Sequence, residues 1–131
     1  MQAYGNKVRI VFKDFPLPNH AEAFKAAEAA HCAGEQRKYW EMHDAMFANQ
    51  RELQVPALKK AARALGLDGA TFDQCLDSGR HTANVRADYE LGERVGVNST
   101  PTIYINGRAL VGAQPFEAFK QIIDEELARA R

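Results

Sequence analysis

The sequence of 131 residues lacks several features that would assign it to a broad functional class. Its 17 basic and 17 acidic side chains cancel, so the chain has neither the positive charge typical of nucleic-acid binding nor an acidic tail. No apolar run approaches the roughly 20 residues that cross a bilayer, and residues 1–6 lack the apolar core of a secretory signal. We therefore expect no nucleic-acid partner, no membrane span and no signal peptide in this chain.

Motifs that would define a catalytic centre are also missing. The sequence contains no glycine-rich phosphate loop and no Gly-x-Ser-x-Gly elbow, and its acidic pairs fall on helix faces expected to be solvated. The two cysteines, Cys32 and Cys75, form no Cys-x-x-Cys, and no short ligand spacing of a structural zinc site links them to His31, His43 or His81. We predict no catalytic residue, no metal site and no cofactor, and we expect His43 to be a hydrogen-bonded core residue beside Trp40 and Phe47.

What the chain does contain is a strand-like segment followed by a long helical stretch. Val8, Ile10 and Phe12 alternate with polar residues, which predicts a strand over 7–13 that two prolines then end. Asn19 is the predicted N-cap of the first helix, and Pro56 suits the first turn of the third. The expected helices are 20–33, 37–49, one that begins at Pro56 and ends near Gly66, a short one closed by Gly79, 82–95, and a last helix that begins at Pro115.

A β-hairpin is predicted between the last two helices. The run 102–105 has high strand propensity and leads into Asn106-Gly107, the residue pair typical of a type I′ turn. Because 102–105 shows no polar alternation, we expect both faces of this strand to be covered. Pro101 cannot donate to a ladder, so it belongs at the mouth of the strand, where a cis peptide bond is one candidate arrangement.

The order of these segments resembles that of the DsbA-like thiol–disulfide oxidoreductases. The matching segments are 8–17, 29–36, 39–44, 65–68, 72–76, 96–102 and 105–107. The resemblance implies an α/β fold of thioredoxin type, with a large helical insertion at about 19–95 in a single domain over 1–131. In that family a strand and a helix that begins with Cys-x-x-Cys precede the region matching Lys7, so we expect a partial domain that lacks this N-terminal βα unit.

The expected absence of that unit predicts association. The missing strand would lie between 8–13 and 102–105, and its omission leaves a gap of roughly 9 to 10 Å. Uncovered strand edges invite pairing with another chain, so we expect a homodimer in which a second copy fills the gap. The alternative is that the two remaining strands pair directly.

The resemblance also implies a role in forming or isomerising disulfides of exported proteins, in the periplasm or a similar compartment. We expect this chain to be inactive as given, because the redox cysteine pair is absent. The alternative is a catalytically inert module that binds peptides or forms oligomers. By resemblance, Ser99, Thr100 and Pro101 would hold an extended polypeptide next to a cis-proline; the simpler interpretation is that Pro101 only starts a strand, with the usual trans bond.

The two cysteines leave two structural alternatives. They form either a disulfide between helices of the insertion or two small buried thiols. An oxidising compartment, which the resemblance implies, favours the Cys32–Cys75 bridge. Closing a loop of about 43 residues would stabilise the fold by about 4 kcal/mol.

Overall fold

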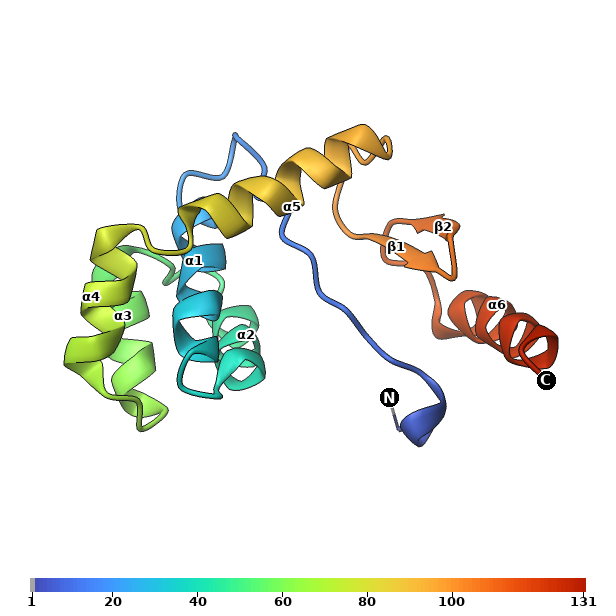
Figure 1. The fold of residues 1–131 in the computed structure, drawn as a ribbon, viewed down its shortest axis with the longest axis horizontal. Coiled ribbons are helices and arrows are strands. Elements are labelled where there is room, and N and C mark those ends of the chain that lie inside the picture. The colour runs from blue at the N-terminus through green and yellow to red at the C-terminus, as the bar shows by residue number, and fades with distance from the viewer. Residues whose placement is uncertain (1) are drawn as a thin grey trace. The chain divides into compact units, whose positions relative to one another are not determined.

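A computed structural model describes residues 2–131, in which six α-helices accompany one two-stranded antiparallel sheet (Figure 1). These residues divide into two compact units. We call Asp14–Leu91 the helical unit, and residues 2–13 together with Gly92–Arg131 the terminal unit. Over residues 2–131, no helix combines the length and the apolar character that crossing a membrane requires.

The helical unit is built from short helices that local signals start and stop. Pro56 lies in the first turn of its helix, where its missing N–H costs nothing. The Asp68 carboxylate accepts the backbone N–H of Thr71 at 2.9 Å and so caps the next helix, which ends at Gly79 with a left-handed φ of 66°. The helices are α1 (Ala23–Gly34), α2 (Tyr39–Ala48), α3 (Val55–Ala64), α4 (Gly69–Ser78) and α5 (Thr82–Arg94), whose last turn belongs to the terminal unit.

Helices α1 to α4 pack together around one core (Figure 1). Ala29 and Ala33 on α1 have no exposed surface, and their small side chains let the neighbouring helices approach closely. Phe72 on α4 is also completely buried, as is Met42 on α2. Every buried residue of the described chain belongs to this unit, so the helical unit has a complete core of its own.

Two details of the predicted helices are wrong. The first helix begins at Ala23 rather than just after Asn19, because residues 17–23 form consecutive turns in which Leu17 and His20 accept backbone N–H groups. Trp40 and Phe47, expected in the core, are 46% and 58% exposed. The side of α2 that faces the core carries Met42 instead.

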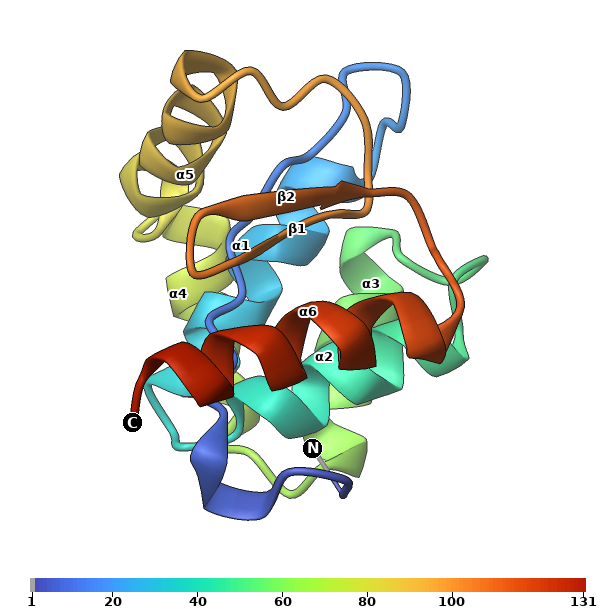
Figure 2. The ribbon, with the colours of Figure 1, turned by 90° about the vertical axis from the view of Figure 1, so that its right-hand side faces the viewer.

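In the terminal unit, a hairpin of β1 (Thr102–Ile105) and β2 (Arg108–Val111) pairs Thr102 with Val111. Asn106 and Gly107 both have positive φ, 49° and 86°, so the turn has the backbone signature of the predicted type I′ turn. Helix α6 (Phe116–Arg129) lies beside the hairpin (Figure 2), and Arg108 Nη1 binds Glu125 at 2.7 Å. A 3₁₀ turn, η1 (Gly5–Lys7), precedes the extended segment 8–13.

The expected strand at 7–13 is not a strand in the structure. Val8 has extended dihedral angles, φ −127° and ψ 134°, yet residues 8–13 join no ladder within residues 2–131. The prediction that both faces of 102–105 are covered is also wrong, since Ile103 and Tyr104 are 37% and 45% exposed. The sequence pattern identifies strand-forming residues, but a strand also needs a neighbour, and within residues 2–131 only β1 and β2 have one, each in the other.

Candidate functional site

The loop before β1 contains the three residues predicted to bind substrate. The Thr100–Pro101 peptide bond is cis. The hydroxyl of Thr102 donates to the Ser99 carbonyl at 2.7 Å, and the N–H of Gly112 donates to the Pro101 carbonyl at 2.8 Å. These bonds hold the loop on both sides of the Thr100–Pro101 pair, and both residues of the pair are exposed.

This loop runs directly into a strand edge. One edge of β1 is bonded to β2, and within the described residues no strand lies on the other edge. In an antiparallel pair the N–H and C=O groups of alternate residues point away from the partner strand, so β1 presents a row of such groups outward. An extended polypeptide could add to this edge as a further strand.

The two cysteines lie in the helical unit. A disulfide joins Cys32 of α1 to Cys75 of α4, with the Cα atoms 5.8 Å apart, so the bridge rather than a pair of free thiols is present. Both residues are 1% exposed. Because thiol–disulfide exchange requires an attacking thiolate to reach a sulfur atom, this buried bridge is suited to holding helices together and unsuited to exchange with a substrate.

A buried polar cluster that sequence reasoning missed lies in the same unit. Asp14 is 5% exposed, its Oδ2 atom is 2.6 Å from Nε2 of His31, and its backbone N–H donates to Asp88 at 3.0 Å. The hydrogen bond to Asp14 is the main cause of a raised pKa of His31. Burial raises the pKa of Tyr39, and the charges of Asp14 and Asp88 raise it further. No spacing signal predicts this cluster, because Asp88 is 74 positions from Asp14.

The other histidines occupy different surroundings. His43 lies 3.0 Å from the Asp44 carboxylate and packs against Trp40 and Phe47, so it is hydrogen-bonded as predicted, although its aromatic neighbours are exposed. His81 is brought to the Cys32–Cys75 bridge, which sequence spacing had not indicated.

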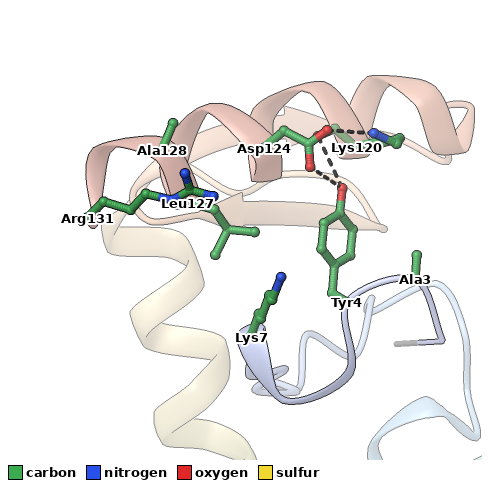
Figure 3. Close-up of a pocket in the computed structure, with 8 residues that line it drawn as sticks. All are labelled: Ala3, Tyr4, Lys7, Lys120, Asp124, Leu127, Ala128 and Arg131. Carbon is green, nitrogen blue, oxygen red and sulfur yellow. Dashed lines mark hydrogen bonds and ion pairs between the residues drawn. The ribbon is translucent and has the colours of Figure 1, made fainter.

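The terminal unit also has a shallow hollow between residues 3–7 and α6 (Figure 3). The hydroxyl of Tyr4 donates to Asp124 at 2.8 Å, and Lys120 lies 2.6 Å from the same carboxylate. The hydrogen bond from Lys120 is the main cause of a lowered pKa of Asp124, and the hydrogen bond from Tyr4 lowers it further. The polar groups satisfy one another, so the arrangement ties the N-terminal segment to α6.

Comparison with known proteins defines the class. Residues 2–125 match the family described as thioredoxin, which is nearly the whole chain. The chain therefore belongs to the thioredoxin family, and its fold is a thioredoxin-like α/β domain, mostly helical, with one two-stranded antiparallel sheet among the described residues.

Individual relatives of the chain carry the name of an Na⁺/H⁺ antiporter. The chain is 37% identical over 125 residues to Na⁺/H⁺ antiporter NhaA 3 of Salinispora tropica, a match that covers 95% of this chain and 19% of the relative. It is 34% identical over 129 residues to NhaA 1 of Mycobacterium sp. strain KMS, covering 96% and 21%. It is 33% identical over 110 residues to NhaA of Herminiimonas arsenicoxydans, covering 84% and 17%. The chain thus spans about a fifth of the length of the curated relatives that it matches.

Proposed function

We propose that the chain is the substrate-holding part of a DsbA-like protein thiol–disulfide oxidoreductase that acts on exported proteins in the periplasm. The observation that carries this proposal is the exposed Thr100–Pro101 pair, which continues into the unpaired edge of β1. Main-chain hydrogen bonds along such an edge bind an extended chain with little regard to its sequence. That property suits an enzyme that must accept many unfolded substrates.

The role proposed for these 131 residues is binding and positioning. Their only two cysteines are joined in a bridge that is 1% exposed at each end. The dithiol that exchanges with substrate is therefore assigned to another segment or chain, whose sulfurs would act beside the Thr100–Pro101 pair. The relatives named as antiporters are about five times as long as the region that matches this chain. The proposed function applies to the matched region only.

The test is a titration of the ¹⁵N-labelled chain with an extended, unstructured peptide. The expected result is a set of shift changes confined to Ser99, Thr100 and residues 102–105. The matched control is the same peptide with alternate backbone nitrogens methylated, which removes the donors for a ladder and should bind at least about tenfold more weakly. Equal shifts with both peptides, or shifts located only in the helical unit, would contradict strand addition.

A disulfide-reduction assay on the same chain separates binding from catalysis. The expected result is no reduction of a protein disulfide above the background of the thiol reductant. If the chain does reduce the disulfide, and replacing both Cys32 and Cys75 by Ala abolishes this activity, then the bridge itself exchanges with substrate. The binding-only role would then be wrong.

A second candidate role is association with a second copy of the chain. It is favoured by the terminal unit, in which no described residue is buried and several large apolar side chains are exposed. These include Ile10, Val11, Ile103, Val111 and Phe116, which are 37% to 58% exposed. Sedimentation equilibrium at micromolar concentration is expected to show a dimer, whereas a stable monomer would leave peptide binding as the only proposed use of the β1 edge.

A further inference from the structure

Three side chains with metal-binding atoms meet at the Cys32–Cys75 bridge. The sulfurs of Cys32 and Cys75 and a ring nitrogen of His81 all lie within 4.8 Å of one another. They come from α1, from α4 and from the turn just before α5. Two sulfurs and an imidazole nitrogen form a ligand set typical of zinc. While the bridge is intact, its sulfurs are bonded to each other and cannot serve as thiolate ligands.

The surroundings of His81 fix its imidazole ring. One ring nitrogen, Nε2, lies 3.0 Å from the Glu35 carboxylate, and the other, Nδ1, lies 2.7 Å from the side-chain amide of Asn84. Arg80 holds the second Glu35 oxygen at 2.8 Å. With the Glu35 carboxylate accepting from Nε2, the lone pair of Nδ1 accepts from the Asn84 amide, so zinc binding at Nδ1 requires this amide to move away. A carboxylate on the opposite ring nitrogen commonly orients zinc-bound histidines. His31 stacks on the ring with centroids 5.4 Å apart.

We propose that, when the disulfide is reduced, Cys32, Cys75 and His81 bind a zinc ion. Two molecules of a thiol reductant supply two electrons and two protons to the bridge, which gives two cysteine thiols and one disulfide of the reductant. Zinc then binds the two sulfurs as thiolates and displaces their two protons, while neutral His81 supplies its lone pair. A water molecule from solvent completes the tetrahedral site.

The geometry requires only local movement. In a tetrahedral site with Zn–S bonds of about 2.3 Å and a Zn–N bond of about 2.1 Å, the donor atoms lie about 3.5 to 3.8 Å apart. The two sulfurs must therefore separate from bonding contact, and the ring nitrogen can move closer to both. Helices α1 and α4, which carry the cysteines, pack against each other in the core, so a metal at this point would hold α1 to α4 as the disulfide does.

The same two sulfurs can therefore either form the disulfide or bind zinc, but not both at once. In the oxidised chain the bridge links α1 to α4, and in the reduced chain zinc does so. The metal would bind the two buried thiolates and hold the helical unit of the reduced chain together.

The experiment uses the full chain in both redox states. Protein is unfolded, reduced with a thiol, freed of reductant without oxygen, and refolded with either zinc or a chelator; a parallel sample keeps its disulfide. The expected result is one zinc per reduced chain, none per oxidised chain, and blocked thiols in the zinc-loaded sample. Cobalt(II) in place of zinc should give the absorption of a tetrahedral thiolate complex. A reduced chain that folds and takes up no metal, or equal uptake by the oxidised chain, would overturn the proposal.

Variants then test the third ligand. His81→Ala should weaken zinc binding by the reduced chain at least about tenfold, whereas His20→Asn, at an exposed position away from the cysteines, should leave it unchanged. His81→Gln serves if the alanine variant fails to fold, because it keeps a polar side chain beside Glu35. Unchanged affinity in both His81 variants would show that the two thiols alone bind metal, and the site as proposed would be wrong.

Discussion

The helical unit and the terminal unit differ in how much of their apolar surface is buried. The helical unit buries Phe72, Met42 and Leu58 completely, satisfies its buried Asp14, and is crosslinked between α1 and α4. In the terminal unit the described residues include none that is buried, and the hairpin and α6 expose apolar side chains such as Val111 and Phe116. Burial of apolar surface is the main favourable term in folding, so the two units differ in the source of their stability.

The comparison indicates which unit of this thioredoxin-family chain would gain stability from contact with another chain. The helical unit forms its buried core from its own residues. The hairpin and α6 present a strand edge and an apolar face that would gain stability from any chain that covers them. The following predictions distinguish the two units, in order of decreasing effect.

The largest effect is expected from emptying the core of the helical unit. Phe72→Ala should lower the free energy of unfolding by about 3 to 5 kcal/mol, because it removes a completely buried ring and leaves a cavity. Phe116→Ala, at a position 52% exposed in the terminal unit, should change it by less than about 1 kcal/mol. Urea unfolding followed by fluorescence of Trp40, the single tryptophan, reports on the helical unit. Equal losses in the two variants would remove the distinction between the units.

Removing the disulfide should have the next largest effect. The bridge closes a loop with a sequence separation of 43, so replacing both Cys32 and Cys75 by Ala should cost about 2 to 4 kcal/mol. The same urea experiment measures the change. Peptide binding at the β1 edge should persist in this variant under conditions where it remains folded, and loss of binding there would mean that the two units depend on each other.

The His31–Asp14 pair should make stability depend on pH. The pKa of His31 is raised in the folded protein, chiefly by its hydrogen bond to Asp14. The stabilisation is therefore fully present below about pH 6.5, the usual value for histidine, and is lost as the pH rises through the raised folded value. Urea midpoints of wild type and His31→Asn should converge as the pH increases. His20→Asn, at an exposed position, is the control, and a constant gap across this range would contradict the assignment.

The smallest effect concerns the N-terminal tie of the terminal unit. Desolvation raises the pKa of Tyr4, and the hydrogen bond to Asp124 raises it further. Asp124→Asn removes the negative charge and should move phenol ionisation of Tyr4 to lower pH, with little change in stability. An ultraviolet titration of the four tyrosines measures this shift, and Tyr4→Phe identifies the responsible ring. An identical titration curve in Asp124→Asn would mean that the contact is not formed in solution.

Local signals account for the parts of the structure that the sequence predicted. The Asn106-Gly107 turn, the start of α3 at Pro56 and the end of α4 at Gly79 each depend on the backbone preferences of one or two residues. Such preferences act within a few positions, so no knowledge of the rest of the fold is needed. The disulfide was foreseen only as one of two alternatives, because pairing depends on where two helices meet.

Features that depend on distant partners were not predictable in the same way. The alternation at Val8, Ile10 and Phe12 marks residues able to form a strand, but pairing requires a neighbouring strand that the described chain does not provide. The approach of His81 to the cysteines and of Asp88 to Asp14 follows from helix packing. The binding role of Ser99, Thr100 and Pro101 stays a prediction.

Hydrogen exchange, resolved by residue, tests the contrast between the units most directly. We expect backbone amides of α1 and α4 to exchange only through global unfolding of the helical unit. Amides of β1 and β2 should exchange through local opening, which has a much lower free energy. Addition of an extended peptide should then slow exchange along 102–105 and leave α4 unchanged. Protection of β1 equal to that of α4 in the monomeric, peptide-free chain would contradict the account.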